Sequence, residues 1–122
     1  MSKPFIFARV YVEMRTHEKI WPLPDSQYRL YVDSLMWCRD RLTDGFIAEA
    51  LISQVSPIRS PRSVAQALAK AGLFDRCDGG WMIHDYAVHQ DTNDVIEERR
   101  KHRQRGANET NRIRWSDRSS VR

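Results

Sequence analysis

The sequence predicts a small α+β domain in which several helices precede a β-hairpin. Three observations support this prediction: apolar residues recur at helical spacing over residues 25–71, the dipeptide Ser60-Pro61 is a typical helix start, and a glycine turn at residues 78–80 separates two short apolar segments. With 122 residues, of which 41% are hydrophobic and 30% charged, the chain can bury one core. We expect this domain to span residues 1–90.

Residues 5–12 predict a β-strand before the helices, because β-branched and aromatic side chains dominate this segment. Pro22 and Pro24 then exclude regular helix until Asp25, whose carboxylate can accept hydrogen bonds from the free amides of a helix start. The helix that follows should end near Asp44-Gly45, where glycine can adopt a left-handed conformation. Its apolar face is predicted to contain Tyr28, Tyr31, Val32, Leu35, Cys38 and Leu42.

Two shorter helices are expected next. Residues 46–55 repeat the helical pattern of apolar side chains and must end before Pro57. Ser60-Pro61 offers a hydroxyl cap and a first helical residue that needs no N–H, so a further helix should run from Pro61 to about Ala71 and end at Gly72. We expect this helix to bury Val64, Ala67, Leu68 and Ala71.

A hairpin with strands at residues 73–77 and 81–84 is predicted after this helix. The chain then permits a further helix over residues 91–106, with acidic residues near its start and basic residues near its end. Because few apolar residues follow its first turn, this basic helical extension should leave the domain and fray near Gly106. We expect residues 107–122 to be a disordered tail.

Positive charge is concentrated at the C-terminus. The chain has a net charge of +4, but residues 97–122 alone hold nine basic and four acidic residues, so the rest is close to neutral. A positive segment beside a neutral body indicates a polyanionic partner, although such tails are often only solvated. With only Cys38 and Cys77, no secretory leader and no apolar stretch of bilayer length, we expect a cytoplasmic protein with reduced thiols and no membrane partner.

The predicted order of elements is that of a winged helix, a helix-turn-helix variant whose β-hairpin extends a DNA contact. A helix fits the major groove of double-stranded DNA, where Arg, Gln and Ser can read base edges or bind phosphate. The predicted DNA-binding residues on the helix, at its start and on the hairpin are Arg59, Ser60, Arg62, Ser63, Gln66, Lys70 and Arg76. The extension adds Arg99, Arg100, Lys101, Arg103 and Arg105, which would supply affinity without sequence choice.

Each of these features has a plainer interpretation. The outer face of any helix is polar, and Glu97 and Lys101 can form an i,i+4 pair on a merely solvated helix. Winged helices also dimerise or dock partner proteins, so a protein-interaction module without DNA binding is the alternative function. Its partner would be a second copy of the chain or a replication or transcription protein.

Other candidate sites are weak. The cysteines and histidines show no pair at an established zinc-ligand spacing, and Cys38 lies on an apolar helix face, so we expect no metal and no cofactor. No nucleophile motif or phosphate loop accompanies His84-Asp85, which we expect to close the hairpin rather than to act in an enzyme. The aromatic residues that could stack nucleic-acid bases are expected in the core: Trp21, Tyr31, Trp37, Trp81 and Tyr86.

Several motifs resemble small helix-turn-helix proteins of actinobacteria and their phages. They are Arg29-Leu30-Tyr31, Trp37-Cys38, residues 42–47, Ala71-Gly72-Leu73-Phe74 and residues 78–86, which begin with Asp-Gly-Gly-Trp. Over about residues 5–105 the chain is also similar to the N-terminal winged-helix domain of phage replisome organisers, which bind origin DNA and help to load the replicative helicase. The resemblance implies a DNA-binding domain with a basic helical extension that serves replication initiation or transcriptional regulation.

The chain departs from this family at Tyr31, Phe74 and Tyr86, where tryptophan is more usual, and at residues 88–91, where a Tyr-Asn-Pro run is usual. The aromatic replacements can still fill the hydrophobic core. Without the proline, the sequence does not fix the residue at which the last helix begins. Longer members carry a second domain that contacts the helicase. We therefore expect no complete helicase-loading activity from these 122 residues.

Overall fold

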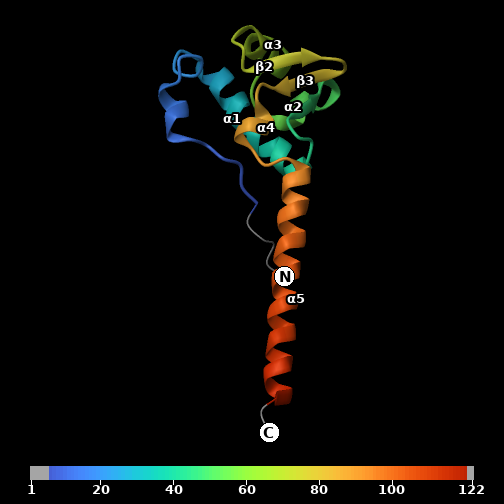
Figure 1. Cartoon of the computed structure of the whole chain (residues 1–122). Coiled ribbons are helices and arrows are strands. Elements are labelled where there is room, and N and C mark those ends of the chain that lie inside the picture. The colour runs from blue at the N-terminus through green and yellow to red at the C-terminus, as the bar shows by residue number, and fades with distance from the viewer. Residues whose placement is uncertain (1–5, 121–122) are drawn as a thin grey trace. The chain divides into compact units, whose positions relative to one another are not determined.

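The computed structural model describes residues 6–120, with the backbone alone described for residues 107–120. The chain divides into two units, Met1–Gln90 and Asp91–Arg122. The first unit contains helices, a sheet and the hydrophobic core, and the second contains the long helix α5 (Asn93–Ser120) (Figure 1). The predicted α+β class is confirmed.

The first unit combines short helices with a small antiparallel sheet. Its helical elements, where η marks a 3-10 helix, are η1 (Val12–Thr16), α1 (Asp25–Arg41), η2 (Glu49–Leu51), α2 (Ile52–Val55), α3 (Pro61–Lys70) and α4 (Tyr86–His89). Its strands are β1 (Phe46–Ala48), β2 (Phe74–Cys77) and β3 (Gly80–Ile83). Strand β3 is central and pairs antiparallel with both β1 and β2. Helix α3 packs against α1 on one side and against β2 on the other (Figure 1).

Helix α1 begins at Asp25 as predicted, but Pro24 holds the N-cap position and no side chain caps the helix. The helix buries Tyr31, Leu35 and Cys38. Two predictions for its apolar face are wrong, because Tyr28 is 43% exposed near the N-terminal end and Leu42 is 52% exposed beyond the last turn. The buried stripe instead includes Leu30 and Ser34. The Ser34 hydroxyl donates a hydrogen bond to the Leu30 carbonyl oxygen at 2.6 Å, which satisfies this polar group inside the core.

The end of α1 lies earlier than the glycine that was predicted to mark it. Leu42 itself adopts the left-handed conformation, with φ 57° and ψ 44°, and the Thr43 amide donates to the Cys38 carbonyl at 3.1 Å. A left-handed backbone at leucine is unfavourable, but this residue is exposed and its neighbours close the helix with this hydrogen bond. Gly45, with φ +96°, instead turns the chain into β1.

Residues 46–48 form a strand, so the prediction of a helix over residues 46–55 is wrong for its first half. Phe46 and Ile47 pair with Met82 and Trp81 of β3, and Ile47 is fully buried. Short apolar runs are ambiguous between helix and strand, and a distant partner decided the outcome here. Within residues 46–55, helical structure is limited to η2 and α2, and α2 ends before Pro57 as predicted.

The N-terminal strand predicted over residues 5–12 is also wrong for the residues that the structure describes. Residues 6–11 have no regular structure, and Val12–Thr16 is η1. The backbone of Arg9 exchanges hydrogen bonds with a side chain instead of a strand: its amide donates to Gln90 Oε1 at 2.8 Å, and Gln90 Nε2 donates to its carbonyl at 2.7 Å. Propensity alone does not make a strand where no sheet edge receives it.

Helix α3 and the hairpin follow the prediction closely. Ser60 occupies the N-cap position with φ 50°, although its hydroxyl makes no capping hydrogen bond, and Pro61 is the first helical residue. Gly72, with φ +82°, ends the helix. Leu68 is buried as predicted, whereas Val64, Ala67 and Ala71 are only half-buried because Ala65 faces the core directly.

Helix α5 continues through Gly106, so the predicted end of the helix at this residue is wrong. A glycine inside an exposed helix costs about 1 kcal/mol relative to alanine, which is too little to end the helix by itself. Two residues of the predicted disordered tail, 121–122, lie outside the described part of the chain. Among the helices of residues 6–120, none has both the length and the apolar character that a bilayer crossing requires.

Candidate nucleic-acid interface

The outer face of α3 is polar and exposed at the positions that were predicted from the sequence to bind DNA. Ser63 and Gln66 are exposed, and so are Arg62 in the first turn and Lys70 in the last. The inner face of the helix is anchored by Ala65 and Leu68, neither of which has any exposed surface. The amphipathic pattern therefore fixes which side of α3 meets solvent.

Glu49 links this helix to the hairpin. Its Oε1 lies 3.3 Å from Nε of Arg62 on α3, and its Oε2 accepts a hydrogen bond from Nη2 of Arg76 on β2 at 2.9 Å. One carboxylate thus joins two guanidinium groups that lie on different elements. The trio has a net charge of +1 when all three groups are ionised.

Backbone pairing explains why Glu49 lies beside the hairpin. It follows directly after β1, whose last residue Ala48 pairs with Gly80 of β3. The Glu49 amide then donates a hydrogen bond to the Gly79 carbonyl in the hairpin turn at 2.8 Å. These main-chain contacts of Ala48 and Glu49 with the hairpin hold the Glu49 side chain near β2.

Arg76 is held from a second direction by Trp81. The two residues are directly paired across β2 and β3, and the guanidinium carbon lies 4.7 Å from the centroid of the Trp81 ring. This is the geometry of a cation–π contact. The indole is otherwise fully buried, as predicted for a core aromatic residue, so a fixed surface positions this arginine.

The electrostatics of the trio keep Glu49 ionised. The hydrogen bond from Arg76 lowers the pKa of the Glu49 carboxyl, and the positive charges of Arg76 and Arg62 act in the same direction. An ionised carboxylate at this position orients the guanidinium groups. Their charge is only partly neutralised, and both arginine side chains remain at least half exposed.

Three further cationic or capping residues complete the predicted set on the first unit. Arg59 and Ser60 are exposed immediately before α3, and Lys70 is exposed at its end. Neither Arg59 nor Lys70 forms an ion pair with any other described residue. The first turn of α3 contains no acidic residue, so an anion near its amides would meet no carboxylate of the helix itself.

The basic segment of α5 forms a separate group of charges. Arg99 donates to Asp91 at 2.6 Å and Arg100 to Glu97 at 3.0 Å, so the pairing expected between Glu97 and Lys101 is replaced by an i,i+3 pair. All five predicted basic residues of this segment are exposed. Those without an ion pair among the described residues are Lys101, Arg103 and Arg105.

The weaker candidate sites take ordinary structural positions. His84 Nδ1 lies 2.9 Å from Asp75 on β2 and Nε2 lies 3.5 Å from Asp85, which ties the end of the hairpin together. Cys38 is fully buried and Cys77 is partly buried. In the described part of the chain, no group of three potential metal ligands is brought together.

The aromatic residues follow the core prediction with one exception. Tyr31, Trp81 and Tyr86 are buried, and Trp37 is half-buried against the core. Trp21 is 67% exposed in the irregular segment before α1, so the prediction of a core position is wrong for this residue. Prolines on either side of Leu23 prevent the segment from forming a helix that could turn the indole inward.

Sequence reasoning missed Glu49. One signal was available, since it is the only acidic residue between Asp44 and Asp75.

Comparison of the chain with protein-family models, curated proteins and solved structures finds no match.

Proposed function

We propose that this chain is a winged-helix protein that binds double-stranded DNA, with α3 as the recognition helix and the β2–β3 hairpin as the wing. The observation that carries the proposal is the pairing of Glu49 with Arg62 of α3 and Arg76 of β2. Through this carboxylate, the helix and the hairpin present cations on one surface. A duplex that receives α3 in its major groove would meet both arginines.

The ion pairs orient the arginines without using all of their donors. A guanidinium group has five N–H donors. Arg62 meets Glu49 through Nε, so both of its terminal nitrogens remain for the O6 and N7 acceptors of a guanine. Arg76 contacts Glu49 through Nη2 and lies on Trp81, which leaves donors for a backbone phosphate beside the hairpin.

Gln66 and Ser63 extend the same contact along the helix. Gln66 lies four residues after Arg62, so both side chains occupy one face of α3. Glutamine can bond the N6 and N7 groups of adenine, and a serine hydroxyl suits a base or a phosphate. Arg59, Ser60 and Lys70 lie at the two ends of the helix, where phosphates flank the major groove.

The basic segment of α5 makes a second contribution to DNA-binding affinity, which does not depend on the DNA sequence. Lys101, Arg103 and Arg105 would release condensed counterions when they contact phosphate, with a log–log salt slope of about −0.9 per contact. Base readout by α3 and charge neutralisation by α5 are therefore separable by experiment. Whether the protein serves replication initiation or transcriptional regulation follows from the DNA sequence that it selects.

Selection from a random duplex library, followed by fluorescence anisotropy on the selected site and on random duplex, tests the proposal. Arg62→Gln and Gln66→Ala should each cost on the order of 1–3 kcal/mol on the selected site and less on random duplex. Arg29→Gln is the matched control, because Arg29 is also an exposed arginine, paired with Asp33 at 2.7 Å on α1. It should leave both affinities unchanged.

Two results would reject this function. Equal losses on selected and random duplex for Arg62→Gln would exclude base readout by α3. The absence of any salt-sensitive duplex binding by the full chain would instead favour a protein-interaction module, in which the outer face of α3 contacts a protein.

A further inference from the structure

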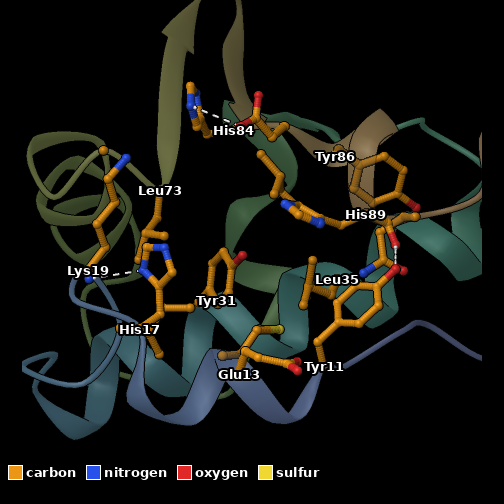
Figure 2. Close-up of a pocket in the computed structure, with 16 residues that line it drawn as sticks. Tyr11, Glu13, His17, Lys19, Tyr31, Leu35, Leu73, His84, Tyr86 and His89 are labelled. Atoms are coloured by element: carbon orange, nitrogen blue, oxygen red, sulfur yellow. Dashed lines mark hydrogen bonds and ion pairs between the residues drawn. The ribbon is translucent and has the colours of Figure 1, made fainter.

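A cavity lies within the first unit, away from the outer face of α3. It has a volume of about 440 Å³ and lies between the N-terminal segment that contains η1 and the body formed by α1, the end of β3 and α4 (Figure 2). Pockets for small organic ligands typically measure about 300–1,000 Å³. The cavity is therefore large enough for a molecule with one or two rings.

The inner wall of this cavity is apolar. Apart from Gln90, whose side-chain amide is hydrogen-bonded to the Arg9 backbone, its buried lining residues are Ile20, Tyr31, Leu35, Leu73, Ile83 and Tyr86. They come from four separate parts of the chain and belong to the hydrophobic core. A ligand with a flat apolar body would find the same surroundings as a core side chain.

One polar group on this wall has no partner. Tyr31 is 9% exposed, and its hydroxyl forms no hydrogen bond with any other described residue. Figure 2 shows this hydroxyl directed into the cavity. Burial raises the pKa of Tyr31, so the hydroxyl stays protonated and can donate to a ligand. Unlike the fully buried indole nitrogens of Trp37 and Trp81, this hydroxyl reaches the open space of the cavity, so water or a ligand can hydrogen-bond to it there.

A positively charged side chain, Lys19, lies at the rim of the cavity. The Lys19 ammonium lies over Gly72, where a Cβ atom would be 3.3 Å from Nζ, and it forms no ion pair among the described residues. Beside it, His17 Nδ1 accepts a hydrogen bond from the Lys19 amide at 3.1 Å, which places the ring proton of neutral His17 on Nε2. The lining of the cavity thus includes one charged donor, from Lys19, and one neutral donor, from His17.

The other titratable groups around the cavity are engaged or exposed. Asp85 lies 3.5 Å from His84 Nε2, and Glu13 is exposed to solvent. Tyr11 closes one wall, because its hydroxyl donates to the His89 carbonyl at 3.0 Å and its ring packs edge-on against the His89 imidazole. Neither carboxylate is paired with Lys19. The ammonium group of Lys19 can therefore attract an anionic group of a ligand.

We propose that this cavity binds a small aromatic anion, with its rings against Leu35, Leu73 and Ile83 and its acidic group between Lys19 and His17. The Tyr31 hydroxyl then donates a hydrogen bond to the ligand body. The site is formed by other residues than DNA binding, since the cavity does not include any of the residues assigned to the duplex.

The test uses the full chain without DNA and two fluorescent probes that differ in one group. Anilinonaphthalene sulfonate carries an acidic group, whereas N-phenylnaphthylamine has the same rings without it. We expect the sulfonate to saturate at one equivalent. Of the four histidines, the imidazole proton resonances of His17, His84 and His89, which line the cavity, should shift, whereas those of His102 in α5 should not.

Three variants then separate charge, hydrogen bonding and background. Lys19→Gln should weaken the sulfonate about five- to tenfold and the neutral probe less than about twofold, as expected for the loss of one partly exposed charged contact. Tyr31→Phe should weaken the sulfonate by about two- to fivefold. Arg15→Gln removes a charge from η1 outside the cavity and should change neither affinity.

The proposal is overturned if the sulfonate does not saturate, or if Lys19→Gln and Arg15→Gln have the same effect on it. It is also overturned if His102 shifts together with the other three histidines, because the probe would then bind without regard to the cavity.

Discussion

The backbone of Gly80 packs directly against the carbonyl group of Ile47, so closely that a Cβ atom at position 80 would overlap the Ile47 oxygen. This contact joins the central strand β3 to β1, where Ala48 and Gly80 are paired. It also determines the position of Glu49, the next residue along the chain. The glycine is therefore required by close backbone approach rather than by turn geometry, because its φ is not positive.

Gly80→Ala should destabilise the domain by about 2 kcal/mol or more, because the added methyl group meets backbone that cannot move aside. Gly79→Ala is the matched control: Gly79 has φ +79° but nothing within 4 Å of its would-be Cβ, so only conformational strain of about 1 kcal/mol is expected. Urea unfolding followed by circular dichroism measures both. If Gly80→Ala costs no more than Gly79→Ala, the close contact with Ile47 is not as described.

The sequence predicted those elements whose signals are local. Helix α3 has a cap position, a first-turn proline, an apolar stripe and a terminating glycine, all within thirteen residues, and it formed as expected. The hairpin likewise depends on a turn of adjacent residues. The errors occurred where a distant partner decided the structure, as for β1, which needs β3, and for Arg9, whose backbone is bonded to Gln90.

The candidate site was predictable to the same degree. Exposure of Arg62, Gln66 and Lys70 followed from helical periodicity, because each lies outside the apolar stripe that includes Leu68 on α3. The partnership between Glu49 and Arg76 joins residues that are 27 positions apart, and no local pattern encodes it. Such contacts depend on how distant strands pair, and local patterns in the sequence do not show which distant strands are partners.

The two thiols should differ sharply in reactivity. Burial raises the pKa of the Cys38 thiol to about 11, against an ordinary value of 9.0, and the side chain is fully buried. At mildly alkaline pH, its thiolate fraction is then about a hundredfold lower than that of an ordinary cysteine. Ellman's reagent should therefore modify only Cys77 in the folded protein and both thiols in urea. Rapid modification of Cys38 before unfolding would contradict its position in the core.

The Glu49 carboxylate predicts a specific dependence of stability on pH. Because hydrogen bonding to Arg76 lowers its pKa below the ordinary value of 4.5, the folded state is favoured when this group is ionised. This contribution is fully present above pH 4.5 and is lost as the pH falls through the lowered pKa. The difference in unfolding free energy between the native chain and Glu49→Gln should thus be constant near neutral pH and shrink in acid.

A double-mutant cycle assigns this effect to its cause. In an Arg76→Gln background, Glu49→Gln should show a smaller pH-dependent difference, since the hydrogen bond that lowers the carboxyl pKa is absent. Urea unfolding at a series of pH values from neutral to below 4.5 provides the measurement. An unchanged difference in this background would mean that Arg76 does not stabilise the charged form of Glu49.

The salt dependence of DNA binding distinguishes the cations of α5 that form an ion pair with a described residue from those that do not. Replacing Lys101, Arg103 and Arg105 together by glutamine should reduce the log–log salt slope by up to about 2.7, at about 0.9 for each lost phosphate contact. Because these residues are proposed to contact only phosphate, the ratio of affinities for selected and random duplex should not change. Anisotropy titrations at several salt concentrations measure both quantities.

Arg99→Gln with Arg100→Gln is the comparison within the same helix, since these arginines are already paired with Asp91 and Glu97. Contact with phosphate requires them to leave or share these carboxylates, so their replacement should reduce the slope by less per residue than the triple substitution does. Equal reductions per residue would show that the ion pairs do not persist on DNA. An unchanged slope in the triple variant would remove α5 from the phosphate contact altogether.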